Sequence, residues 1–473
     1  MNILKEIKLV NKILVDYPEE FILIDNYNLL KITKDAKKHK KEIFLKKFFL
    51  LNIYLLYFIC KYSFIFIFKK NISHQNKKQF KFSKLSFFVG TFNQYKSLKD
   101  LINNFDEKNI YLIDKGHESF IKGSENINTR ILNTNKKNFL IMLFFIFTRS
   151  KKILKKVIKY PSLNYRFLLS QNIKIYPILA NFIEEFHNSK TNVLVLSNSH
   201  NRTNICLILV CKLFKIKTAY LQHASITKNF PPLICDFNFL DGNYSFDKYK
   251  EIEKTSNIKI KTKRNIFLTG SINSPKNTFS HKKNPREYIG FCIGLRDDIK
   301  KVIKDCDLCL KLGYKISLRL HPRESEKRWD SFYEYVSKNR LINLHNAKEK
   351  ELEIFLEEIF CCLACSSAIQ LETALAGIPN LYRDWSFNAI FDRYEFIKNG
   401  LCIKSLDNKD FENNINLARI GELSVPKNNI KYYSDTYGAE KFGSEFLAIK
   451  ENLENIIKGV KPKYLNGYKS FFY

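Results

Sequence analysis

The feature that most constrains the fold is a repeated alternation between short apolar runs and longer segments of helical periodicity. Apolar runs of strand length occur at 84–90, 109–114, 192–198, 217–223, 237–242 and 265–270, and again at 288–294, 315–321, 342–345, 361–365 and 379–382. Near-continuous apolar runs are typical of strands buried on both faces of a parallel sheet. Alternation of such strands with helices predicts an α/β fold with doubly wound parallel sheets.

The alternation stops once and then restarts, which predicts two domains. The interruption at 271–287 is polar, contains two prolines and lacks periodicity, so we interpret it as a linker. The expected units are a basic N-terminal region (1–83), a first Rossmann-like domain (84–270), a second Rossmann-like domain (288–450) and a C-terminal tail (451–473). In such a pair the ligand crevice lies between the domains, at the carboxyl ends of the strands.

Composition excludes some classes of protein and leaves others open. A hydrophobic content of 45% in 473 residues is enough for real cores, so the chain as a whole is not disordered. The net charge of +32 fits anionic partners, but Lys and Asn enrichment is also typical of an AT-rich genome. The lysine runs have no aromatic residues interleaved for base stacking, so we expect no nucleic-acid partner. Most of the 11 cysteines stand in apolar runs, which indicates a reducing compartment and no metal site.

Two apolar stretches suggest contact with a membrane. Residues 48–68 are nearly long enough to span a bilayer, but Lys61 interrupts them and lysines flank both ends. A spanning helix, a helix lying in the interface and a buried helix all remain open for this stretch. Residues 138–147 are also apolar and precede 148–160, where lysines alternate with aliphatic residues at helical spacing. We expect peripheral or monotopic association with an anionic membrane, at the cytoplasmic face of the inner membrane.

Polar residues that can bind an anion follow two strands of the second domain. His321, Pro322 and Arg323 come directly after one predicted strand, and Ser366 and Ser367 follow another where a helix is expected to begin. Strand ends of a parallel sheet converge on one edge, and a helix N-terminus with hydroxyl groups favours negative charge. A histidine and an arginine nearby add charged donors. The pattern predicts a phosphate site, and the simplest ligand is a nucleotide.

Glu372 lies about one and a half turns into the helix expected after the serines, so it can face the same crevice. A solvent-exposed helix residue is an equally ordinary role for it.

The stretches "LRLHPRE" and "CSSAIQLETALAGIPNLY" resemble the His-Pro and Ser-Ser motifs of the bacterial sialyltransferase and polysialyltransferase group, and of related capsule glycosyltransferases. The resemblance implies two Rossmann-like domains of the GT-B type and a nucleotide-sugar donor, typically a CMP-linked acid sugar. It implies that His321, Pro322, Ser366 and Ser367 hold the donor's phosphate. Because these residues would stabilise the charge on the departing phosphate, we expect no metal and no cofactor.

The catalytic base is expected in the first domain, with two alternatives. "YLIDKGHESF" resembles the acidic-acidic-glycine motif of the same group, which implies that Asp114 is the base and Gly116 the turn residue. Lys115 stands where the group has its second acid. "TAYLQHASITKNFPPL" is similar to the Gln-His-Gly stretch of CDP-polyol phosphotransferases, with Ala224 in place of glycine, which makes His223 a second candidate. A strand-end histidine bonded to a carbonyl is the ordinary alternative for His223.

The sequence therefore predicts an enzyme of surface polysaccharide biosynthesis, either capsule or lipopolysaccharide, that transfers a sugar to a glycan or lipid-linked acceptor. The alternatives are a CDP-polyol phosphotransferase, a UDP-sugar 2-epimerase of the same fold, and a non-catalytic basic protein that binds membranes or RNA.

Overall fold

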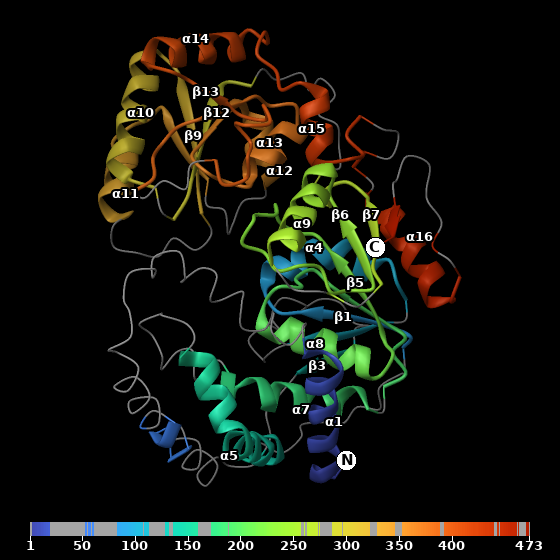
Figure 1. Ribbon diagram of the computed structural model, residues 1–473. Helices are drawn as coiled ribbons and strands as arrows, with labels where there is room; N and C mark the ends of the chain where they lie inside the picture. The colour runs from blue at the N-terminus through green and yellow to red at the C-terminus, as the bar shows by residue number, and fades with distance from the viewer. Residues whose placement is uncertain are drawn as a thin grey trace.

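The computed structural model contains two α/β domains (Figure 1). It describes residues 2–18, 53, 55–57, 59–60, 83–106, 108–112, 128–131, 136–158, 172–187, 189–256, 260, 263–272, 274, 286–295, 297–321, 329–345, 352–387, 392–438, 442–443, 445–460, 462 and 470–472.

The first domain is built on an eight-stranded sheet with the order β14-β7-β6-β5-β4-β1-β2-β3. Its strands are β1 (Leu85–Val89), β2 (Asn109–Leu112), β3 (Asn128–Ile131), β4 (Val193–Leu196), β5 (Lys217–Leu221), β6 (Phe237–Leu240), β7 (Asn265–Leu268) and β14 (Ser470–Phe472). All neighbours pair in parallel except β14, which is antiparallel to β7. The strand order reverses between β1 and β4, so this is the switch point of the sheet.

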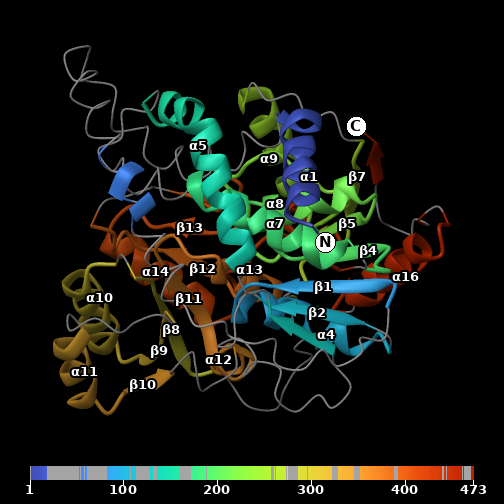
Figure 2. The same ribbon diagram turned by 90° about the horizontal axis from the view of Figure 1, so that it is seen from below.

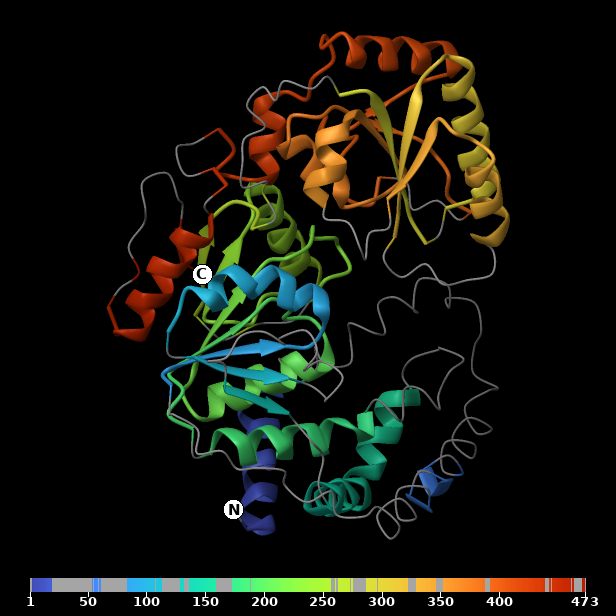
Figure 3. The same ribbon diagram turned by 180° about the vertical axis from the view of Figure 1, so that it is seen from behind.

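Helices cover both faces of this sheet (Figures 1 and 3). They are α1 (Ile3–Asp16), α4 (Phe92–Asn103), α5 (Lys136–Ile158), α7 (Ile175–Phe186), α8 (Arg202–Leu213), α9 (Asn243–Ser256) and α16 (Glu445–Ile457). The apolar side chains of α1, α5, α7 and α8 form one core. Those of α4 and α16 form a separate core with the opposite side of the sheet. The fold therefore buries the central strands on both sides, as their continuous apolar sequence requires.

The second domain has a six-stranded, fully parallel sheet with the order β10-β9-β8-β11-β12-β13. Its strands are β8 (Tyr288–Ile293), β9 (Lys315–Leu320), β10 (Ile342–His345), β11 (Ile359–Ala364), β12 (Asn380–Tyr382) and β13 (Ile403–Lys404). Its helices are α10 (Ile299–Lys311), α11 (Asp330–Ser337), α12 (Leu352–Glu358), α13 (Ile369–Leu375), α14 (Asn408–Arg419) and α15 (Lys427–Tyr433). The prediction of two doubly wound α/β domains is confirmed.

The end of the chain returns from the second domain to the first (Figure 1). Tyr433 of α15 packs against Tyr244 of α9 with ring centroids 4.5 Å apart, and the Asp435 N–H donates to the Asp241 carbonyl at 2.9 Å. A Cβ atom at Gly242 would lie 2.7 Å from the Tyr433 backbone, so only glycine allows this close crossing. The domain boundary expected at residue 450 falls inside α16, which packs on α4.

The two apolar stretches that suggested contact with a membrane have different positions. The second one, 138–147, lies within α5, and its buried side chains join the first-domain core. Of 48–68, the described residues are 53, 55–57 and 59–60, and Leu55 packs into the same core. Within the part of the chain that the structure describes, no helix is both long and apolar enough to cross a bilayer.

The cysteines are free thiols, and all of them except Cys60 are buried. Those of the second domain pack among apolar side chains of its core. No cluster of three or more His, Cys, Asp or Glu side chains that could hold a metal ion occurs among the described residues.

Candidate functional site

The switch point of the second sheet lies between β8 and β11, and a predicted phosphate-binding residue stands beside it on each side. The His321 N–H donates a hydrogen bond to the carbonyl of Ile293, the last residue of β8, at 3.1 Å. β9 and β11 both pair with β8, one on each side. If their pairing registers are extended past the ends of the strands, His321 and Ser366 both lie opposite Gly294, on either side of it. Two strand spacings separate their backbones, which is about 10 Å.

The loop that follows β8 is a tight turn, and it lies between His321 and Ser366 in space. The buried Asp297 carboxylate accepts a hydrogen bond from the Gly294 N–H at 2.7 Å, and the Asp297 N–H donates to the Gly294 carbonyl at 3.2 Å. Asp298 then caps α10 by accepting from the Lys300 N–H at 2.9 Å. These bonds hold the β8 loop close to the sheet edge, between His321 and Ser366.

The Ser366 hydroxyl is the polar group at this edge whose bonding capacity is unused. Its Oγ atom is buried and has no hydrogen-bond partner among the residues described. Buried polar atoms are nearly always hydrogen-bonded, so a buried hydroxyl without a partner needs an explanation. A bound phosphate oxygen would supply the missing acceptor.

The serines lie in a loop and do not cap the helix that follows. The helix α13 begins at Ile369, two residues later than the sequence suggested, and has no side-chain cap. The loop is held instead by the buried side chain of Gln370. In the amide orientation that satisfies both of its polar atoms, the nitrogen donates to the Cys365 and Ser367 carbonyls at 3.3 and 3.1 Å. Because α13 has only seven residues, local hydroxyl and backbone donors matter more at this edge than a helix dipole.

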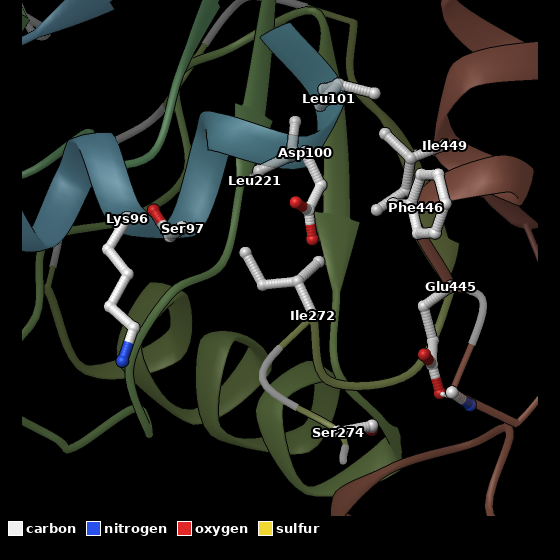
Figure 4. Close-up of a pocket in the computed structure, with 11 residues that line it drawn as sticks. Lys96, Ser97, Asp100, Leu101, Leu221, Ile272, Ser274, Glu445, Phe446 and Ile449 are labelled. Carbon is white, nitrogen blue, oxygen red and sulfur yellow. Dashed lines mark hydrogen bonds between the residues drawn. The ribbon is translucent and has the colours of Figure 1, made fainter. Parts of the chain in front are cut away.

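Glu372 faces the first domain from α13. Burial raises the pKa of its carboxyl to about 7, and the negative charge of Glu353 acts in the same direction. The positive charges of Lys96 and Arg319 act against this rise. Lys96 belongs to α4 of the first domain, from which its side chain extends in Figure 4. The Glu372 carboxyl therefore lies close enough to the first domain to be affected by the charge of Lys96.

Arg319 places a second cation near Glu372. It lies on β9, two residues before His321, and its guanidinium carbon is 5.8 Å from the centre of the Phe355 ring of α12. Burial lowers the pKa of Arg319, whereas the charge of Glu372 acts to raise it. A carboxyl group whose pKa is raised to near neutrality is a candidate for a role in ligand binding.

The first domain presents histidines at the carboxyl ends of β4 and β5. Burial lowers the pKa of His223, although a hydrogen bond to the Ser197 backbone opposes the shift. The imidazole is therefore neutral at neutral pH, with one ring nitrogen protonated and the other able to accept a proton. The carbonyl-bonded arrangement is the ordinary role that the sequence left open for His223.

His200 belongs to the same edge and supports the loop after β4. Its ring lies 4.5 Å from the Phe230 ring, and its Nε2 is 3.3 Å from the Asn198 amide nitrogen. The side-chain oxygen Oδ1 of Asn198 also accepts from the backbone N–H of His200 at 3.0 Å and of Asn201 at 3.3 Å. The polar sequence "SNSHN" that follows β4 therefore forms a turn held by hydrogen bonds between its own residues.

A small cavity lies between α4 and α16 (Figure 4). Lys96 and Asp100 line it from α4, Ile272 and Ser274 from the loop after β7, and Glu445 from α16. Its volume of about 40 Å³ holds a few water molecules and is too small for a nucleotide. This cavity is therefore not the predicted crevice.

Three of the predicted site residues lie outside the described parts of the chain. They are Pro322 and Arg323, which follow His321, and Asp114, which comes two residues after β2. The sequence reasoning missed Lys96, Arg319 and Gln370. Gln370 could have been found as a polar residue at helical spacing from Ser366, whereas nothing in the sequence pairs Lys96 with Glu372.

Comparisons with known proteins extend the description of the fold. No protein-family model matches the sequence, and no curated protein matches it significantly. Among solved structures, MnaA from S. aureus, in a co-structure with UDP, shares 12% of residues over 81% of this chain and 100% of that chain, with a TM-score of 0.50. UDP-GlcNAc 2-epimerase from Neisseria meningitidis bound to UDP-GlcNAc has 13% identity over 79% and 99%, with a TM-score of 0.49. MurG from Acinetobacter baumannii has 10% identity over 77% and 99%, with a TM-score of 0.45.

At this level of identity the likeness to MnaA concerns the fold alone. It extends over both domains, because all of MnaA is covered. The chain has the two-domain α/β fold of the GT-B type.

Proposed function

We propose that the protein is a glycosyltransferase that uses a nucleotide-activated sugar and binds the donor between its two domains. This proposal is supported by one observation above all. His321 and Ser366 lie at the same height along β8, one on each side of it, at the switch point of the second sheet. In open α/β sheets, ligands bind in the crevice at such a point. The unused Ser366 hydroxyl adds a specific donor there.

The donor phosphate is proposed to lie over the β8 loop. The Ser366 hydroxyl and the His321 imidazole would donate to its oxygens, and Arg323 and Ser367 are proposed to add further donors. As the bond between the anomeric carbon and the phosphate oxygen breaks, negative charge grows on the departing phosphate, and these donors stabilise it. Glu372 would accept hydrogen bonds from hydroxyl groups of the nucleoside, which fits its place beside Lys96. No metal is required in this scheme.

The acceptor hydroxyl is proposed to approach from the first domain. Asp114 or, failing that, His223 takes its proton while the hydroxyl oxygen attacks the anomeric carbon. A neutral His223 whose pKa is lowered by burial is already in the base form at pH 7. The finer proposal, from the sequence resemblance, is a CMP-linked acid sugar as donor and a glycan or lipid-linked acceptor of surface polysaccharide synthesis.

A UDP-sugar 2-epimerase is the second candidate, and the likeness to MnaA, whose structure was solved with UDP, favours it. An epimerase needs no acceptor and changes a UDP-sugar on its own. A transferase releases the nucleotide only when an acceptor is present, apart from slow hydrolysis.

The experiment is a two-stage nucleotide panel. Thermal unfolding with CMP, CDP, UDP and GDP identifies the base, because a ligand that binds only the native state raises stability in proportion to ln(1 + [L]/Kd). Incubation with CMP-linked and UDP-linked sugars, with and without a glycan acceptor, then scores nucleotide release and the sugar product. Stabilisation by CMP and acceptor-dependent CMP release support the transferase. Acceptor-independent conversion of a UDP-sugar supports the epimerase, and no stabilisation by any nucleotide refutes both.

A further inference from the structure

The helix α5 carries apolar side chains on the face that points to solvent. Leu140, Phe144 and Phe147 are 40%, 40% and 65% exposed, and their spacing of four and three residues puts them on one stripe. The opposite face packs Ile141 and Phe145 into the core of the first domain. A helix that is apolar on both faces is typical of one with a second apolar environment, because scattered exposed apolar residues do not line up in this way.

A second exposed apolar face lies nearby, in the segment 53–60. Ile53, Leu56 and Tyr57 are exposed and have the spacing of one helix face, while Leu55 is buried in the core. This short segment lies beside α5 in all three ribbon views (Figures 1 to 3). Its aromatic residue, Tyr57, is of the type enriched where protein meets the boundary of a membrane.

The helix α1 adds positive charge next to these two faces. Its exposed Lys5, Lys8 and Lys12 recur at spacings of three and four residues, so they share one side of the helix. The helices α1 and α5 are joined by an ion pair between Glu6 and Lys137 and by a hydrogen bond from Arg149 to the Asn11 side chain at 2.8 Å.

We propose that these features form one docking surface for an anionic lipid bilayer, made of exposed residues of α5 between 140 and 147, of residues 53, 56 and 57, and of α1. The apolar stripe would enter the boundary between headgroups and acyl chains, and the lysines would contact anionic headgroups. Charge complementarity decides the partner, because lysines beside aromatic and aliphatic side chains suit an anionic interface better than a second copy of the same basic surface. The surface lies in the first domain, away from the switch point of the second sheet, so the inference does not depend on the proposed function.

The test uses the full-length protein and vesicles, without nucleotide. Flotation with vesicles of equal parts phosphatidylglycerol and phosphatidylcholine should carry the protein upward, whereas pure phosphatidylcholine vesicles should carry at least about tenfold less. The double variant Phe144→Ser/Phe147→Ser should lose about tenfold in binding. A matched control, Leu341→Ser/Leu406→Ser, removes two exposed apolar residues of the second domain and should bind as the wild type does.

A second readout does not depend on how much protein survives purification. The chain's two tryptophans, Trp329 and Trp385, are buried in the second domain, so Phe147→Trp supplies a new signal from the stripe. Its emission should shift to shorter wavelength with anionic vesicles and be quenched by brominated acyl chains. The proposal is overturned if the wild type does not bind anionic vesicles. It is also overturned if Phe144→Ser/Phe147→Ser binds them as well as the wild type does. A wild-type dimer that the serine substitutions convert to a monomer also overturns it, because the surface would then join two copies of the chain.

Discussion

Lys96 of α4 and Glu372 of α13 interact electrostatically across the two domains. Burial raises the pKa of the Glu372 carboxyl to about 7, and the Lys96 ammonium group acts against that rise. The pair connects the edge that carries His321 and Ser366 with the first domain.

The first prediction concerns stability and pH at Glu372. A carboxyl whose folded pKa is raised from 4.5 to about 7 stabilises the fold while it is protonated, and this stability is lost as pH rises through 7. We expect Glu372→Gln to be more stable than the wild type at pH 8.5, by up to about 3 kcal/mol, with a much smaller difference at pH 4. Urea unfolding at the two pH values measures this. The exposed Glu451→Gln is the matched control, and an equal effect of Glu372→Gln at both pH values would contradict the account.

The second prediction tests Lys96 as the source of the opposing charge. Lys96→Met keeps the length of the side chain and removes its charge, so the pKa of Glu372 should rise further above its ordinary value. The difference in stability between wild type and Glu372→Gln should then level off at a higher pH, and at a larger value, when both carry Lys96→Met. Lys99→Met, on the same helix, is the control. If that pH does not change, Lys96 is too far from Glu372 to affect its pKa.

A third prediction separates binding from folding at Ser366. Its hydroxyl has no partner among the described residues, so Ser366→Ala should change the free energy of unfolding by no more than about 0.5 kcal/mol. Nucleotide affinity should fall about 10- to 100-fold, because a hydrogen bond to a charged group contributes about 1.5–3 kcal/mol. Ser337→Ala, which removes an exposed hydroxyl on α11, should change neither quantity. Loss of stability without loss of affinity would make Ser366 a structural residue.

The fourth prediction addresses the base. If His223 accepts the proton, His223→Gln lowers kcat by about 10²–10⁴-fold, and the rate of the wild type falls on the acid side at a pH below 6.5, because burial lowers the imidazole pKa. If Asp114 does so, Asp114→Asn has this effect and the acid limb lies closer to the reference value for Asp of about 3.9. Full rates in both variants would show that neither is the base.

The fold could be predicted largely because its central strands are continuous apolar runs. The runs that contain β1, β4, β5, β8, β9 and β11 were all expected, since strands buried on both faces leave this mark in the sequence. β3 was not expected, because "NTRI" is half polar and pairs on one side only. The antiparallel β14 was missed for a different reason: it reaches β7 from the end of the chain, and no local pattern shows that return.

The candidate site divides in the same way. His321 and Ser366 could be predicted because strand ends of a parallel sheet share one edge, so their positions follow from local pattern. Lys96, Arg319 and Glu372 come together only through the packing of two domains and two strands, which residue spacing does not encode. The late start of α13 also escaped prediction, because the buried Gln370 amide bonds the preceding loop in place of a serine cap.

The central claim is that His321 and Ser366 hold the same phosphate group, and a double-mutant cycle on nucleotide binding tests it most directly. Calorimetry would compare the best nucleoside monophosphate with its nucleoside, for the wild type, His321→Ala, Ser366→Ala and the double variant. We predict that each single variant weakens binding of the monophosphate at least about tenfold, that the two losses are not additive, and that nucleoside binding is unchanged. Equal losses for nucleoside and monophosphate, or no loss at all, would contradict the claim.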